Sequence, residues 1–233
     1  MNNKITKIST VLLALILPLS ALSAKEAPPE TTFDGLNLVK NEKHTLAYLR
    51  DNTDFSEYNK ILILPSQVAF KKNWQRNYNN DHMMTSRIKN NDVEKIKKGV
   101  AELFDETFAE HMAKVEGYTV VAENGPGVLI LKPAIINLDV HAPDIKTANR
   151  TATFTETAGA ATLYLEFYDG VSNEILARVA DAKETRNRGY HSWANRVTNS
   201  ADAKQLIGRW AKQLTEILED IGGVEALSGT EEK

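Results

Sequence analysis

Apolar residues recur with helical spacing in two separate stretches of the chain, and the residues between them follow the period of a strand. The helical stretches cover residues 91–115 and 200–221, where an apolar side chain returns every three or four positions. Between them, residues 161–167 alternate in polarity and lead through an Asp-Gly turn into a second arm at 175–184. This order predicts an α+β fold, with two main helices packed on one face of a mostly antiparallel sheet.

Shorter apolar runs predict the first part of the sheet. Residues 61–64 form a compact run typical of a buried strand, and Val68 and Phe70 are expected to continue it past an irregularity at Pro65. Residues 71–91 are rich in Asn, Lys and Arg and have no sustained period, so they predict a long loop.

Two further strands are expected between the helices, at residues 118–122 and 128–140. The even-numbered apolar residues of the second strand are expected to share one face. Pro133 lies within it and has no N–H to donate to a neighbouring strand. It therefore predicts an edge strand or a bulge at that position.

Capping residues predict where the two helices begin and end. Asn91 and Glu94 have the spacing of a capping box, and Gly117 follows the last apolar position of the first helix. Ser200 is the expected cap of the second helix, which is predicted to end at Gly222-Gly223.

The first 24 residues have the three parts of a secretory signal peptide. Lys4 and Lys7 precede an apolar run at residues 11–19, which is too short to cross a bilayer, and small residues follow it. Cleavage is expected after Ser23 or Ala24. The sequence therefore predicts export and a periplasmic location.

A lipid anchor is not expected, although Leu22-Ser23-Ala24 resembles the start of a lipobox. The next residue is Lys25, where a lipoprotein requires cysteine, and the chain contains no cysteine. Disulfides and thiolate chemistry are excluded for the same reason. The chain would have to be stabilised by packing alone.

The charge balance argues against a nucleic-acid partner. The net charge is −3, and loss of Lys4 and Lys7 with the signal peptide would make it −5. Binding to nucleic acid requires a clustered positive surface, which a mildly acidic chain does not suggest.

The expected organisation has four parts. Residues 1–24 are the signal peptide, 25–32 a charged, Pro-rich flexible tether, 33–223 a single α+β domain and 224–233 a frayed tail.

Five blocks of sequence, in order, resemble an exported bacterial family filed as domain of unknown function 3313 (DUF3313) and described as predicted lipoproteins. The blocks are residues 33–36, 63–75, 133–144, 158–166 and 193–199. The resemblance covers nearly all of the chain after the signal peptide. It implies an address in the cell envelope and no particular reaction, ligand or catalytic residue, and Lys25 departs from the lipoprotein description.

One small group of residues has a spacing compatible with catalysis. Asp139 and His141 would point to the same side of a strand, with Asp144 close behind, and a carboxylate beside an imidazole can act as a general base. The alternative is an orienting hydrogen bond at a strand end, because no nucleophile motif accompanies the group. No metal site or cofactor is expected.

Two basic and aromatic segments are the candidate binding surface, because planar rings and arginine forks are enriched in binding hot spots. The alternative is that both tryptophans are partly buried lids over the core and the charges are solvated. The candidate residues are Lys72, Trp74 and Arg76 in the first segment, and Arg186, Arg188, Tyr190, Trp193 and Arg196 in the second.

Taken together, these features predict a non-enzymatic binding or assembly module of the cell envelope, with an envelope protein or a cell-wall component as partner. Two alternatives remain at this point. One is a small hydrolase that uses Asp139, His141 and Asp144. The other is a homo-oligomeric structural protein that pairs through the strand edge at Pro133.

Overall fold

A computed structural model describes residues 27–42, 45–82, 87–140, 153–155, 159–184, 192–194 and 196–228. The expected signal peptide, His141 and Asp144 lie outside the described residues, as do Arg186, Arg188 and Tyr190. For Trp193 and Arg196 the structure describes the backbone only.

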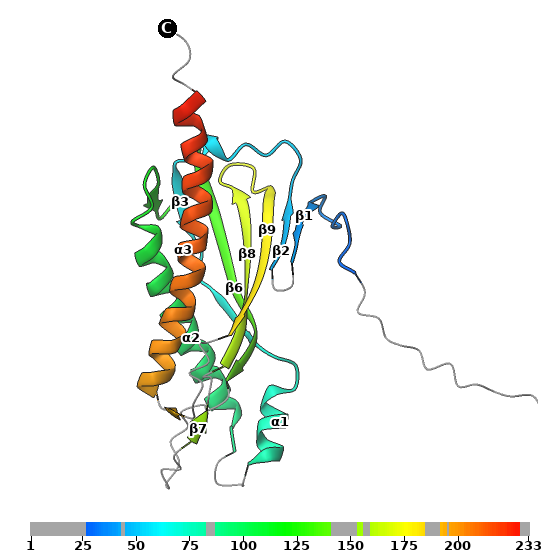
Figure 1. Cartoon of the computed structure of the whole chain (residues 1–233), viewed down its shortest axis with the longest axis vertical. Helices are drawn as coiled ribbons and strands as arrows, with labels where there is room; N and C mark the ends of the chain where they lie inside the picture. Colours follow the sequence, from blue (N-terminus) through cyan, green and yellow to red (C-terminus); the bar gives the residue numbers. More distant parts are fainter. Residues whose placement is uncertain are drawn as a thin grey trace, which may run out of the picture.

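The strands of an eight-stranded mixed sheet lie roughly along the long axis of the protein (Figure 1). The pairs from β1 to β6 are antiparallel, whereas β3, β4 and β5 add in parallel. The strand order is β1 (Asn37–Asn41), β2 (Thr45–Leu49), β9 (Ile175–Glu184), β8 (Gly159–Asp169), β6 (Val128–Val140), β3 (Lys60–Ile63) and β5 (Thr119–Val121), with β4 (Gln67–Phe70) also paired to β6. A second sheet pairs β7 (Thr153–Thr155) with β10 (Ser192–Ala194).

Two long helices, α2 (Asn90–Met112) and α3 (Arg196–Ser228), lie side by side over one face of the sheet (Figure 1). The α+β fold with two main helices on one face is therefore confirmed. A short 3₁₀ helix, η1 (Phe55–Glu57), follows β2. Within the described residues, no helix combines the length and apolar character required to cross a membrane.

The main core lies between these two helices and the sheet. Phe104 and Phe108 of α2 stack with ring centroids 4.9 Å apart, and both are fully buried. Trp210 of α3 belongs to the same core, and the helix-facing residues of β8 complete it. Those residues have the predicted spacing of two, namely Ala161, Leu163, Leu165 and Phe167.

The face assignment predicted for β6 is wrong over the first half of the strand. Leu129, Leu131 and Ile135 belong to the main core, so the odd-numbered residues face the helices there. Asn137 then takes a left-handed conformation (φ 52°), and the pairing with β8 slips between residues 136 and 139. Such a bulge shifts the alternation by one residue, which brings Leu138 into the same core.

The expectation of an edge strand at Pro133 is also wrong, because β6 lies inside the sheet between β8 and the parallel strands. Its parallel partner changes from β3, which pairs up to Leu131, to β4, which pairs from Ala134. Pro133 occupies this break, where β3 and β4 are interrupted. Pairing of two copies through an edge at Pro133 is therefore ruled out.

Residues 74–81, expected in a long loop, form the helix α1 (Trp74–Asp81). Asparagine is a poor helix former, but the tertiary contacts of Trp74 override this local preference. The Trp74 ring is buried, stacks on Phe70 at 3.9 Å, and donates from its indole N–H to the Val140 carbonyl at 3.1 Å.

The helix ends also differ from prediction. Lys89 is the N-cap of α2, and the Asp92 carboxylate accepts its N–H at 3.0 Å, which is the role expected of Glu94. Helix α3 begins before Ser200 and continues through Gly222-Gly223 to Ser228. Glycine costs a helix about 1 kcal/mol and does not by itself end one.

Candidate functional site

Polar residues of three neighbouring strands form one row on the sheet face opposite α2 and α3. Lys132 of β6 is directly paired with Glu166 of β8, and Glu166 with Arg178 of β9. Because the odd-numbered residues of β8 face the helices, the even-numbered Glu166 must face the other side. We call this side the open face of the sheet.

Arg178 is the centre of this row. Its Nη2 lies 2.5 Å from Asp34 Oδ2 and 3.0 Å from Glu166 Oε1, and its Nη1 is 3.3 Å from Asp34 Oδ1. The side chains of Arg178 and Glu166 are only 13% and 11% exposed. One largely buried guanidinium is therefore shared between two carboxylates that are far apart in sequence.

Two tyrosines of β8 also donate hydrogen bonds to the carboxylate oxygens of Glu166. The Tyr164 hydroxyl donates to Oε1 at 3.1 Å, and the Tyr168 hydroxyl donates to Oε2 at 2.8 Å. Lys132 Nζ lies 3.5 Å from Oε2 and 5.6 Å from the centre of the Tyr168 ring. We call Asp34, Lys132, Tyr164, Glu166, Tyr168 and Arg178 together the open-face cluster.

The pKa values of the carboxyl and phenol groups in the cluster are shifted away from neutral pH. Burial raises the pKa of both Tyr164 and Tyr168 to about 12, helped by the Glu166 charge. The hydrogen bond from Arg178 lowers the pKa of Asp34. Burial acts to raise the pKa of Glu166, but hydrogen bonds from Tyr168, Arg178 and Tyr164 outweigh it and lower the pKa. The phenols stay protonated and the carboxyls ionised near pH 7.

Asp34 reaches the cluster from a tight turn that we call the N-terminal hairpin, residues 30–38. The Thr32 N–H donates to the Leu36 carbonyl at 2.8 Å, and the Leu38 N–H to the Glu30 carbonyl at 2.8 Å. Gly35 has φ +80°, the left-handed position that closes a three-residue hairpin loop. Since Glu30 and Thr32 are already paired, the folded part begins earlier than the end of the expected tether.

Packing and hydrogen bonds hold the N-terminal hairpin to the open face. Leu36 is fully buried in a second, smaller core with Tyr48 and Ile175. Arg50 donates to the Asp34 carbonyl at 3.0 Å and to the Ile175 carbonyl at 2.7 Å. The hairpin is therefore fixed at its backbone, its carboxylate and its apolar side chain.

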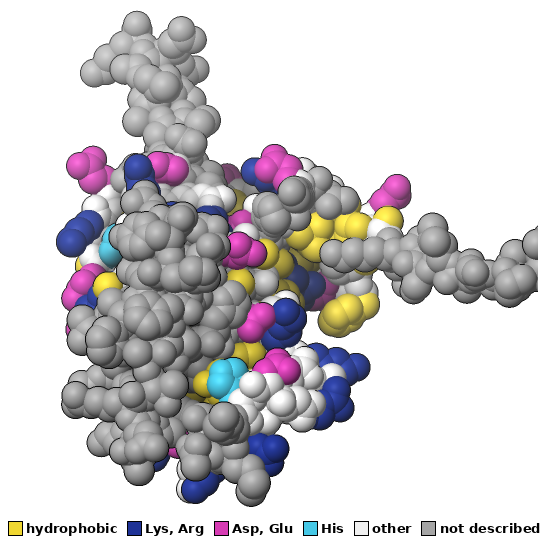
Figure 2. Space-filling model, turned by 60° about the horizontal axis from the view of Figure 1, so that its bottom comes forward, with side chains coloured by type: hydrophobic (Ala, Val, Ile, Leu, Met, Phe, Trp, Pro, Cys, Tyr) yellow, Lys and Arg dark blue, Asp and Glu magenta, His cyan; other side chains and the backbone are white. Residues whose placement is uncertain are grey.

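The first of the predicted binding segments lies at α1. Trp74 is 6% exposed and anchors the helix, so its ring is not offered to a partner. Lys72 and Arg76 are exposed, and neither makes an ion pair with a residue that the structure describes. Figure 2 shows dark-blue side chains gathered around this end of the protein.

The second binding segment is described only in part. Its strand β10 and the start of α3 lie at the same end of the long axis as α1 (Figure 1). Its candidates Arg186, Arg188 and Tyr190, and the side chains of Trp193 and Arg196, lie outside what the structure describes.

Asp139, the only described member of the proposed catalytic group, forms an ion pair with Lys71 at 2.9 Å. The hydrogen bond that Lys71 donates to the Asp139 carboxylate raises the pKa of Lys71. In the described part of the chain, no three His, Cys, Asp or Glu side chains are grouped so that they could hold a metal ion.

Sequence reasoning overlooked the open-face cluster and also Asp181, a carboxylate buried on the helix side. Asp181 is 4% exposed, contacts Lys183, and accepts from the Trp210 indole N–H at 3.0 Å and the Thr45 hydroxyl at 2.6 Å. The signal for the cluster was present, since Tyr164, Glu166 and Tyr168 have the period of one strand face. Their partners on β9 and in the N-terminal hairpin could not be deduced from that period.

A family model described as "Protein of unknown function (DUF3313)" matches residues 33–214. No curated protein matches the chain. The match spans the sequence from the tip of the N-terminal hairpin into α3.

Several solved structures resemble the fold at low similarity. A PelC dodecamer from Paraburkholderia phytofirmans is 7% identical, with 71% of this chain and 94% of that chain covered and a TM-score of 0.35. A hypothetical protein from Chlamydia trachomatis is 8% identical, with coverage of 71% and 99% and a TM-score of 0.37. A Xanthomonas campestris protein of the DUF330 family is 9% identical, with coverage of 77% and 93% and a TM-score of 0.34. Scores at this level carry no information on function.

Proposed function

The chain belongs to the DUF3313 family, and from that premise we propose that it is an exported, periplasmic binding module of the cell envelope that acts without catalysis. The basic start, short apolar run and small residues of positions 1–24 support export. The partner is an acidic envelope protein or an anionic cell-wall component.

A structural role fits the chemistry of the open-face cluster better than a catalytic one. General acid–base catalysis works best when a group titrates near the operating pH. Here the pKa values of Asp34 and Glu166 are lowered and those of both tyrosines are raised. These groups are also engaged with one another, so the cluster is suited to holding the N-terminal hairpin in place.

One observation carries the assignment of the binding surface, namely the concentration of positive charge around α1. Residues 71–89 contain five Lys or Arg and one Asp, in a chain whose net charge is −3. We call the described part of this segment, residues 71–82 and 87–89, the α1 end. A local positive surface on an acidic protein attracts an anionic partner and speeds its association.

The test is a pull-down from envelope extract with native protein and with a Lys72→Glu/Arg76→Glu variant. Both side chains are exposed, so the variant should melt like the native protein. A Lys60→Glu/Lys114→Glu variant is the matched control, since it changes the net charge equally at exposed positions of β3 and beyond the end of α2. Trp74 is left intact because it anchors the helix.

Native protein and the control are expected to capture the same partner, and the Lys72→Glu/Arg76→Glu variant to lose it. Capture should also weaken as salt is raised, because surface charges are screened. Equal capture by all three proteins would overturn the proposed surface. A chain that stays in the cytoplasm during fractionation would overturn the proposed location.

A further inference from the structure

Asn124 and Gly125 form the only Asn-Gly pair in the sequence. They lie in the connection between β5 and β6, residues 122–127, outside any helix or strand. Asparagine is a chemically labile residue, because the backbone nitrogen of the next residue can attack its side-chain amide. Glycine hinders this attack least, since it has no Cβ and its backbone is the most permissive. The pair is therefore a candidate site of spontaneous covalent modification.

Both reacting groups are accessible in the folded protein. Asn124 is exposed, and among the described residues neither its side chain nor the Gly125 N–H has a hydrogen-bond partner. A Cβ placed on Gly125 would meet no atom outside the adjacent residues within 4 Å, so the space beside this residue is open. The reaction therefore requires no hydrogen bond of these two groups to break.

Asn173 provides a comparison within the same protein. It is also exposed, in the turn between β8 and β9, but the next residue is Glu174. The Glu174 N–H donates to Ser172 Oγ at 3.2 Å, and a side chain on residue 174 crowds the attacking nitrogen. Exposure is common to both asparagines, whereas the unbonded nitrogen of a following glycine is found only at Asn124.

We propose that Asn124 deamidates in the folded protein, with water as the only co-reactant. The Gly125 nitrogen attacks the side-chain carbonyl carbon of Asn124 and gives up its proton, and the side-chain nitrogen leaves as ammonia. This step forms a five-membered succinimide ring. Water then opens the ring at either of its two carbonyl carbons, which gives aspartate or isoaspartate. In isoaspartate the main chain runs through the side-chain carbon and is one carbon longer.

The connection is bonded to the sheet on the side that follows the pair. The Gly127 carbonyl accepts from the N–H groups of Asn59 and Lys60, both at 3.1 Å. The Gly125 carbonyl accepts from the Val128 N–H at 3.2 Å. Each deamidation event adds one negative charge ahead of these bonds, and each event that gives isoaspartate also displaces the chain where it enters β6.

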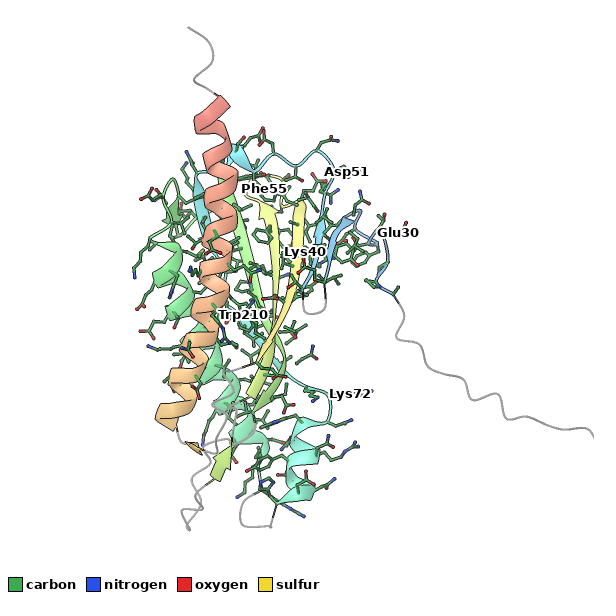
Figure 3. The ribbon with its side chains drawn as sticks, viewed as in Figure 1. Glu30, Lys40, Asp51, Phe55, Lys72 and Trp210 are labelled. Carbon is green, nitrogen blue, oxygen red and sulfur yellow. The ribbon has the colours of Figure 1, made fainter. Side chains whose placement is uncertain are left out.

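The site lies away from the α1 end of the protein. The connection is next to the start of β3 (Figure 1), and Phe55, shortly before β3, lies well apart from Lys72 along the long axis (Figure 3). The added charge is therefore distant from the basic surface proposed to bind a partner. The modification is independent of the proposed function, and its test does not rely on that function.

Peptide mapping by mass spectrometry of purified protein, aged near neutral and at mildly alkaline pH, tests the proposal. The peptide that contains Asn124 is expected to exchange its amide for a carboxylate and to separate by chromatography into aspartate and isoaspartate forms. The peptide that contains Asn173 should keep its amide. The loss at Asn124 should be faster at the higher pH, because the attacking nitrogen must give up its proton.

Gly125→Ala is the matched variant, because the open space at residue 125 accepts a methyl group. It should melt like native protein and lose the Asn124 amide several-fold more slowly, since the Cβ crowds the nitrogen and restricts the backbone. Asn124→Gln cannot close a five-membered ring and should remain a single charge form on ion exchange.

Two results would overturn the inference. In the first, folded protein keeps the Asn124 amide for as long as it keeps the Asn173 amide, while the urea-unfolded chain loses it at Asn124, which would show that the native backbone prevents ring closure. In the second, Gly125→Ala loses the amide as fast as native protein does, which would show that the glycine nitrogen is not the attacking group.

Discussion

The two faces of the sheet are stabilised in different ways. The face under α2 and α3 is covered by apolar side chains, with Phe104, Phe108 and Leu129 fully buried among them. The open face carries the Arg178 ion pairs, beneath a hairpin of only nine residues. Strand β9 contributes to both, with Arg178 on one side and Asp181 on the other.

This difference indicates which contacts dominate the free energy of unfolding and which determine the position of the N-terminal hairpin. Apolar burial stabilises a fold in proportion to area and without direction. A buried ion pair adds little net stability, because the cost of desolvating the charges offsets their attraction, but it penalises the loss of either partner. The helix side should therefore dominate the free energy of unfolding, and the open face should fix where the N-terminal hairpin sits.

The largest effect is expected from the helix side. Phe108→Ala removes a fully buried ring that stacks on Phe104, and it should lower the free energy of unfolding by about 4 kcal/mol. Urea denaturation followed by circular dichroism measures this value. A smaller loss than that measured for Arg178→Met on the open face would contradict this ranking of the two faces.

A smaller loss is expected from Arg178→Met on the open face. This change leaves Asp34 without its cation and Glu166 with only the more exposed Lys132, which should cost about 3 kcal/mol. The triple variant Asp34→Asn/Glu166→Gln/Arg178→Met removes both charges as well and should recover most of the loss. If the triple variant were as unstable as the single one, the penalty would come from lost packing and not from unpaired charge.

Acid should remove the stabilisation that the carboxylates of the open face provide. The folded-state pKa values of Asp34 and Glu166 are lowered, so their stabilisation is present above the unfolded carboxyl pKa of about 4 and is lost as pH falls through the folded values. Urea midpoints measured from pH 7 downward should decline in this window. The triple variant should decline less, and an identical decline would place the acid sensitivity elsewhere.

The smallest effect is expected outside both faces. Lys98 and Glu102 form an exposed ion pair at 3.7 Å on the solvent side of α2. Lys98→Ala should change the free energy of unfolding by less than about 0.5 kcal/mol, because water and salt screen such pairs. If the melting temperature fell as far as that of Arg178→Met, burial of charge would not explain the difference between the exposed and the buried ion pairs.

Local patterns were sufficient to predict the core-facing residues of β8 and α2 from the sequence, whereas the face of β6 was predicted wrongly over its first half. The alternation along β8 and the periodic apolar residues of α2 each specify a buried face without knowledge of the partner strand or helix. Features that depend on distant contacts were missed. Helix α1 forms because Trp74 reaches Phe70 and the Val140 carbonyl, and neither contact is visible in its Asn-rich sequence.

The candidate residues show the same contrast between what composition predicts and what distant contacts decide. Lys72 and Arg76 were identified from composition, and they are exposed beside α1. Trp74 belongs to the same segment by composition but is buried by tertiary packing. The open-face cluster joins the N-terminal hairpin to β8 and β9 and contains no catalytic motif, so only the register of the sheet brings Asp34, Glu166 and Arg178 together.

The separation of 144 residues between Asp34 and Arg178 has a consequence for the order of folding. The ribosome produces the N-terminal hairpin before most of the sheet, whereas its arginine partner follows only after most of the sheet. The entropy of closing so long a loop opposes docking until intervening strands shorten the effective path. The N-terminal hairpin, although synthesised before the strands it docks on, is therefore expected to be among the last segments to be fixed, and its docking marks a completed sheet.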